Sequence, residues 1–549
     1  MLFIREVFLM ISILHNIVLQ IIFIISLVSV GGLLTKLFFK RATGIYALAL
    51  AITCGVTYYA IIGLMLVTIS QVLTGENWKI LRFVSVIIIL LSIIVPVVIS
   101  FKSSSGFSFG ILGFYEWKKP IVFWVILSAI SFSVTQIPVK FPDQLVDGPY
   151  VIKNHNLNVK IQLINGNLPA DNLIPFLVTE YLAKGISFKQ EHPILPGQAV
   201  SNRPILMSLT ALPFRLAYVS SSKQNGSLGT FEYVGQNWPN VAKLSGDKYY
   251  SKFLLIAIVL NSSIIVALFL FISAFNIRKF ENYLVAIFIL NPYTLSQCMF
   301  VWPKFLAAFF ILLALYSLRE KHSPWLVGIS ISLSYLSHPY ALIFMGSILI
   351  YYFLDVFILK SRNFSHILKY LFPFLLSYFV WLFWTRFYLG FASDLVSQNF
   401  ISGMGMENFL WVRMVNFYNL LSPRIFSQYP LNPDGLLSMS IVSLPSMVGF
   451  LFFIQSYMSV FNNFKNDKEF IVFGIIIPTI LIVVIFSYVA VPALHGMQVI
   501  FTLLFVFIGK FYQLLTGNGI KLFKLLVLLQ ICINFYSVYP YMKKIGVFT

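Results

Sequence analysis

Residues that are able to do acid–base chemistry gather in one polar stretch of an otherwise apolar chain. The stretch runs from about 140 to 251 and holds seven of the chain's eighteen acidic residues. Two of them, Asp143 and Asp147, follow directly on an apolar segment of membrane length. A carboxylate there can take a proton from a hydroxyl group or hold a divalent cation. Asp-Gly-Pro also favours a turn, so Asp147 has a structural alternative.

Cationic and aromatic side chains stand at the ends of several other apolar segments. The candidates for binding a phosphate are Arg203, Lys304, His338 and His495, and those for lining the substrate are Tyr150, Trp302 and Tyr488. Guanidinium, ammonium and imidazolium groups can all stabilise a phosphate leaving group. Structural alternatives are snorkelling of Lys304 to the headgroups, a local ion pair of Arg203, and interfacial anchoring of Tyr488.

The composition is that of a membrane protein built from many helices. The chain has 549 residues, of which 59% are hydrophobic and only 10% are charged. The net charge of +20 is spread over Lys and Arg residues at the ends of apolar segments, which argues against nucleic acid as a partner. The three cysteines lie in apolar segments, so they predict neither a disulfide in the polar stretch nor a Cys-x-x-Cys metal site.

The apolar segments predict an all-α polytopic fold with about 12–14 transmembrane helices. They lie near 8–34, 43–73, 80–101, 120–138, 252–275, 281–299, 303–318, 324–337, 339–358, 366–389, 436–459, 469–491, 496–515 and 521–541. The pair at 324–358 is either two spans or one pair kinked at Pro339. No acidic residue falls near the middle of a predicted span, which disfavours an ion-coupled transporter.

Basic clusters fall in alternate loops, and the positive-inside rule therefore places the polar stretch outside the cell membrane. This outer loop, 139–251, is predicted to contain an amphipathic helix over 173–185. A second apolar stretch, 204–218, is predicted to lie in the plane of the membrane interface, or to pack on the outer face. Four regions follow: N-terminal spans 1–119, a core 120–390, a second outer loop 391–435, and C-terminal spans 436–549.

The order of these features resembles the GT-C superfamily of integral-membrane glycosyltransferases, in the branch of protein mannosyltransferases and lipid A aminoarabinose transferases. The matching segments contain Asp147 in Val-Asp-Gly-Pro-Tyr, Arg203 in Asn-Arg-Pro, Lys304 in Trp-Pro-Lys, and the run 328–334 that leads to His338. The resemblance covers roughly 120–390. Two features depart from the family pattern: four spans precede the acidic loop, and the loop has no acidic dipeptide.

The resemblance implies transfer of a sugar from a polyprenyl-phosphate donor to a lipid- or glycan-linked acceptor. It assigns the catalytic base to Asp147 first and Asp143 second, and leaves open whether they hold Mg²⁺ or Mn²⁺. The expected location is the cytoplasmic membrane, surrounded by its lipids, with the active site on the extracytoplasmic side in cell-envelope glycan assembly. Two alternatives remain. A polymerase or ligase of O-antigen type would use Arg386, Arg413 and Arg424, and a flippase would translocate lipid-linked oligosaccharides.

Overall fold

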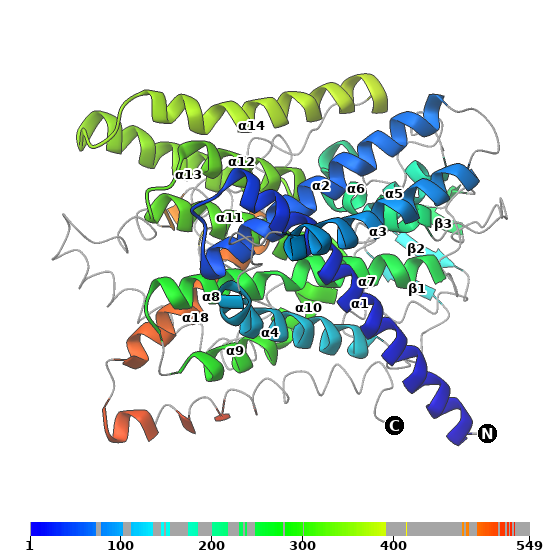
Figure 1. The fold of residues 1–549 in the computed structure, drawn as a ribbon, viewed down its shortest axis with the longest axis horizontal. Coiled ribbons are helices and arrows are strands. Elements are labelled where there is room, and N and C mark those ends of the chain that lie inside the picture. The colour runs from blue at the N-terminus through cyan, green and yellow to red at the C-terminus, as the bar shows by residue number, and fades with distance from the viewer. Residues whose placement is uncertain are drawn as a thin grey trace. The chain divides into compact units, whose positions relative to one another are not determined.

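Helices of membrane length dominate the structure, a computed structural model (Figure 1). It describes residues 2–390 except 73–77, 103–110, 136–143, 148–149, 154–173, 185–199, 218–229, 234–235, 239–247, 278–279 and 300. Beyond 390 it describes 413, 475–476, 479–481, 491–513, 516–521, 524–525, 528–529 and 532. Among these residues, seven helices are long and apolar enough to cross a membrane, or up to eight if a bent pair forms one span. The predicted class, an all-α polytopic membrane protein, is confirmed.

The described residues form two compact units. The first unit comprises residues up to 266 together with 296–303, and the second comprises 267–295 and 304–540. The early helices are α1 (Leu2–Phe38), α2 (Gly44–Val72), α3 (Trp78–Lys102), α4 (Ile111–Thr135), α5 (Ile174–Lys184), α6 (Leu206–Ala217) and α7 (Lys248–Ser262). The later helices are α8 (Ile264–Ala274), α9 (Glu281–Ile289), α10 (Pro292–Met299), α11 (Lys304–Arg319), α12 (Pro324–Ser337), α13 (Ala341–Phe353), α14 (Ser365–Phe383) and α18 (Val491–Gln513). The predicted segment 436–459, and most of 469–491 and 521–541, lie outside the described residues.

Glycines allow the backbones of α1 and α2 to approach closely. A Cβ atom added at Gly31 would fall on the carbonyl oxygen of Ala51, and one at Gly55 would fall on that of Leu27. Small residues have this role in membrane helices because lipid supplies little hydrophobic force between helices, so that close packing has to hold them together. The first two spans therefore form a tightly packed pair.

We expect Gly55→Val to lower the free energy of unfolding by about 2 kcal/mol or more, because the new side chain forces the two helices apart. The control is Gly346→Ala in α13, where an added Cβ meets no atom within 4 Å. That change is expected to be neutral or slightly stabilising, since alanine is the better helix former. Thermal unfolding in detergent measures both variants, and equal midpoints would contradict the packing argument.

A four-stranded antiparallel sheet lies in the polar stretch, and the sequence analysis did not predict it. Its strands are β1 (Gln144–Asp147), β2 (Tyr150–Lys153), β3 (Thr230–Tyr233) and β4 (Gln236–Trp238), paired in that order. Asp147 pairs with Tyr150 in β2, and Tyr150 also pairs with Tyr233 in β3. The β1–β2 hairpin agrees with the predicted turn after Asp147.

Helix α6 corrects the prediction of a helix in the interface plane. The Thr210 hydroxyl lies 3.5 Å from the carbonyl oxygen of Val56, near the middle of the span Gly44–Ile69. A Cβ atom added at Gly63 in the same span would fall on the Leu209 carbonyl oxygen. Helix α6 also packs against α3, α5 and α7 (Figure 1). The loop thus inserts a helix beside the membrane spans, and nearly every side chain of this helix is buried.

In the second unit, α11 packs on α12, and α12 packs on α14. Helix α12 ends at Ser337, because His338 has the extended conformation that the residue before a proline prefers. The chain then turns, and α13 begins at Ala341. The segment 324–358 is thus divided into two helices at the turn around Pro339, and of the two only Ala341–Ile358 is long enough to be a candidate span.

Candidate functional site

A polar break interrupts the most deeply buried of the spans that the structure describes. The span Lys252–Ala274 divides between α7 and α8 at Ser263, and its side chains Asn261, Ser262 and Ser263 are fully buried. The Ser263 amide donates to the Leu260 carbonyl oxygen, three residues back, at 3.3 Å. In a regular helix that amide would donate to Val259 instead. The break therefore leaves the Val259 carbonyl oxygen without its usual hydrogen bond inside the helix, so another donor can bind it.

The indole of Trp124 on α4 satisfies that carbonyl group. Its Nε1 donates to the Val259 carbonyl oxygen at 2.8 Å, and the ring is fully buried. An unsatisfied carbonyl inside a membrane span costs several kcal/mol, which explains why a tryptophan nitrogen faces the break. Breaks of this kind line binding sites in membrane proteins, because the freed backbone groups and polar side chains can meet a substrate.

Arg203 and Trp302 meet beside this break, and both belong to the first unit. The guanidinium carbon of Arg203 lies 4.6 Å from the centre of the Trp302 ring. The Trp302 carbonyl oxygen lies 3.5 Å from the side-chain nitrogen of Asn261. Arg203 follows a 3-10 turn, Val200–Asn202, and stays outside α6 because the residue before Pro204 avoids the helical conformation. The aromatic face of Trp302 attracts the Arg203 cation electrostatically.

The sequence places Arg203 and Trp302 at the ends of apolar segments, whereas their cluster lies beside the interior of the span Lys252–Ala274. Asn261 lies nine residues after Lys252, or about 14 Å along the helix from the start of its span. The cluster thus lies beside the middle of the span. Arg203 reaches that depth because α6, which it precedes, packs among the spans. We name Arg203, Trp302 and Asn261 the mid-span cluster.

A second group of predicted residues meets in the second unit. The hydroxyl of Tyr340 donates to the Lys304 carbonyl oxygen at 2.9 Å, and the Tyr340 amide donates to His338 Nδ1 at 3.2 Å. His338 is 1% exposed and Lys304 is 8% exposed. His338 thus has a local structural role, accepting a bond from the turn at Pro339.

The other predicted residues are described only in part or not at all. For Asp147 and Tyr150 the structure describes the paired backbone, and for His495 the helical backbone in α18. Asp143 and Tyr488 lie outside the described residues. Within the described part of the chain, no cluster of three or more His, Cys, Asp or Glu side chains is placed to hold a metal ion. The assignment of a metal to Asp147 and Asp143 stays a prediction.

Glu180 is a buried carboxylate of the polar stretch, and it forms an ion pair with an arginine. The Arg215 Nη2 atom donates to Glu180 Oε2 at 2.8 Å, and Arg215 Nε donates to Oε1. The Glu180 side chain is 4% exposed and the Arg215 side chain is 7% exposed. The bidentate pair joins α5 to α6, so Glu180 has a structural role.

The polar break was missed in the sequence analysis, although the sequence contains a signal for it. Asn261, Ser262 and Ser263 form a polar triplet inside an otherwise apolar span. Comparisons of the chain with protein-family models, with curated proteins and with solved structures each gave no match. The function therefore has to be inferred from the chemistry of the residues themselves.

Proposed function

We propose that this multi-pass membrane protein is a glycosyltransferase that moves a sugar from a polyprenyl-phosphate donor to a lipid- or glycan-linked acceptor. The reaction belongs to cell-envelope glycan assembly and takes place on the extracytoplasmic side of the cytoplasmic membrane. The main observation in favour is the mid-span cluster, where the Arg203 cation lies on the Trp302 ring beside a broken span. An ionisable residue at membrane depth is a functional candidate by default, because it is costly to keep there.

The depth of Arg203 favours a lipid-linked substrate. A nucleotide sugar is wholly hydrophilic and would need a water-filled path to the middle of a span. A polyprenyl phosphate already has its hydrocarbon chain in the bilayer, so its phosphate can approach the cluster from the membrane side. The guanidinium group offers several donors in one plane, which matches the oxygens of a phosphate.

In the proposed reaction, the Asp147 carboxylate takes the proton of an acceptor hydroxyl group. The hydroxyl oxygen attacks the anomeric carbon of the donor sugar, and the bond from that carbon to the phosphate oxygen breaks. The electron pair of this bond leaves with the polyprenyl phosphate, whose growing negative charge Arg203 stabilises. The hairpin of Asp147 belongs to the same compact unit as Arg203.

The test of this function is the activity of Asp147→Asn in membranes supplied with radiolabelled polyprenyl-phosphate sugars. We expect transfer to fall about 100-fold or more, with normal expression and unchanged donor binding, because Asn cannot accept the proton. The control is Glu116→Gln, an exposed carboxylate at the other end of the preceding span, which should keep full activity.

Other outcomes would redirect the proposal. Full activity in Asp147→Asn together with loss of activity in Asp143→Asn would assign the catalytic base to Asp143, and the proposed class of reaction would stand. Activity that survives both changes but is lost in Arg386 or Arg413 variants would favour a polymerase or ligase. Wild-type membranes that transfer no sugar from any donor would contradict the proposal and favour a flippase.

A further inference from the structure

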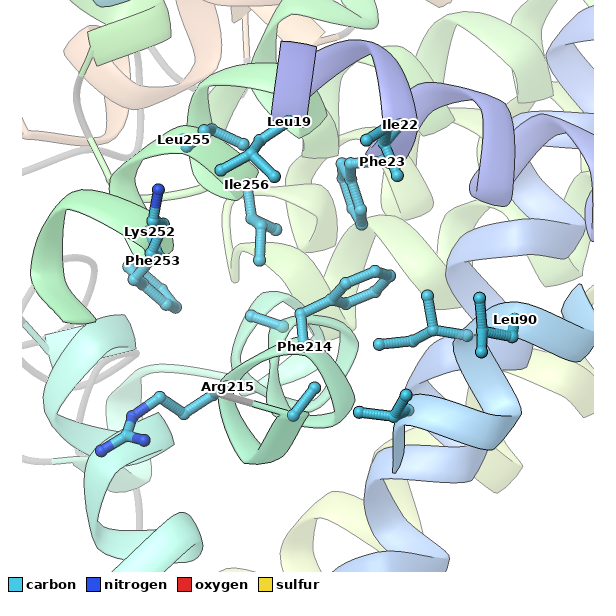
Figure 2. A pocket seen from close by; sticks show the side chains of 14 residues that line it. Leu19, Ile22, Phe23, Leu90, Phe214, Arg215, Lys252, Phe253, Leu255 and Ile256 are labelled. Carbon is cyan, nitrogen blue, oxygen red and sulfur yellow. The ribbon is translucent and has the colours of Figure 1, made fainter. Parts of the chain in front are cut away.

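An apolar cavity lies in the first unit among α1, α3, α6 and α7. Its volume is about 290 Å³, close to the lower limit of about 300 Å³ for ligand pockets. In Figure 2 the apolar side chains of Phe23, Phe214 and Ile256 point into it. Two cationic residues, Lys252 and Arg215, lie at the end away from Leu90. A cavity of this kind suits a hydrocarbon chain with a charged head.

The cavity is open toward the lipid-facing surface of the spans. Two lining residues, Ile22 on α1 and Leu90 on α3, are 42% and 50% exposed. Both lie within candidate membrane spans, Leu14–Phe38 and Lys79–Ile99. Their exposed sides therefore face hydrocarbon, and a lipid chain can enter between them from the bilayer.

The position of Lys252 fits the depth of a lipid headgroup. Lys252 is the first residue of its span, and its ammonium group donates to the side-chain oxygen of Asn16 at 2.9 Å. Asn16 lies on α1, within the candidate span Leu14–Phe38. The polar end of the cavity thus lies at the start of the apolar segment 252–275, near the depth of the phosphates of the bilayer.

Among the described residues that line the cavity, and those that contact them, one positive charge is in excess. Glu180 compensates the charge of Arg215 through two hydrogen bonds. Asn16 accepts a hydrogen bond from Lys252, but because Asn16 is neutral it does not compensate the positive charge of Lys252. An anionic head beside Lys252 would make a charge-assisted hydrogen bond at this site.

We infer that the cavity binds one acyl chain of an anionic bilayer phospholipid, with the lipid phosphate against Lys252. This site is separate from the mid-span cluster, and the inference does not depend on the proposed glycosyl transfer. The bound lipid would fill the space between α1, α3, α6 and α7, and so would hold the inserted helix α6 against the spans.

The experiment titrates the delipidated protein in detergent with phosphatidylglycerol or phosphatidylcholine and counts bound lipids by native mass spectrometry. We expect wild type to bind the anionic lipid at least tenfold more tightly, and Lys252→Gln to remove about a tenfold preference. The matched control is Lys79→Gln, an exposed lysine at the start of the neighbouring span α3, which should leave the preference unchanged. Ala217→Phe, at the end of α6, should weaken both lipids by filling the cavity.

Equal affinity of wild type for the two lipids, or an unchanged preference in Lys252→Gln, would overturn the inference. Displacement of phosphatidylglycerol by an equal concentration of undecaprenyl phosphate would also overturn it, and would make the cavity a polyprenyl site. If Lys252→Gln does not fold, the preference of wild type and the effect of Ala217→Phe still decide the question. None of these readouts requires transferase activity, so they are independent of the reaction.

Discussion

Replacing Arg203 with glutamine is expected to lower the rate of sugar transfer by about 100-fold or more, the usual loss when one donor to a developing anion is removed. Glutamine retains polarity but lacks the positive charge that meets the leaving phosphate. The measurement is transfer from radiolabelled polyprenyl-phosphate sugar in membranes with equal amounts of each variant. Wild-type rates in Arg203→Gln would remove this residue from the site and with it the main support for the proposed function.

Conservative variants separate charge from geometry. Arg203→Lys keeps the cation, but it loses the planar group that stacks on Trp302, so we expect an intermediate rate. Trp302→Phe keeps an aromatic face, although phenylalanine attracts a cation less strongly than tryptophan does. We therefore expect a smaller loss of transfer rate than in Arg203→Gln. Arg82→Gln, at an exposed arginine on α3, is the control for general effects of removing an arginine, and should be neutral.

The sequence was sufficient to predict the membrane-spanning class and most helices of the first part of the chain. The predicted span 252–275 is observed as Lys252–Ala274, and the predicted loop helix 173–185 as α5. Both depend on local patterns: a long run of apolar residues must lie in lipid, and an amphipathic repeat ended by glycine forms a helix.

Features that depend on distant partners were not predictable. The strand at Tyr150 pairs with Tyr233, and strands of three or four residues give almost no periodic signal. The apolar stretch 204–218 was predicted to lie in the interface plane or on the outer face, and its partner Val56 inside a span was not predicted. The depth of Arg203 follows from that packing. The sequence therefore identified Arg203 as a candidate cation, but it did not predict how deep this residue lies.

The second large effect is expected at the buried ion pair of Glu180 and Arg215. Either Glu180→Gln or Arg215→Met alone should lower the free energy of unfolding by about 3–5 kcal/mol, because each leaves the other charge buried without its counterion. The measurement is thermal or denaturant unfolding in detergent. A single variant with unchanged stability would mean that the charge left behind finds another partner or reaches water.

The double variant Glu180→Leu with Arg215→Met tests whether the pair is needed for stability or only for charge balance. Replacing a buried ion pair by apolar groups of similar size is often neutral or stabilising, since the desolvation of both charges is avoided. We therefore expect the double variant to regain most of the stability that the single variants lose. Arg215 also lines the lipid cavity, and its charge is already compensated there. If the double variant keeps its preference for anionic lipid, the lipid phosphate binds at Lys252 alone. If the preference is lost, Arg215 also contributes to binding the phosphate.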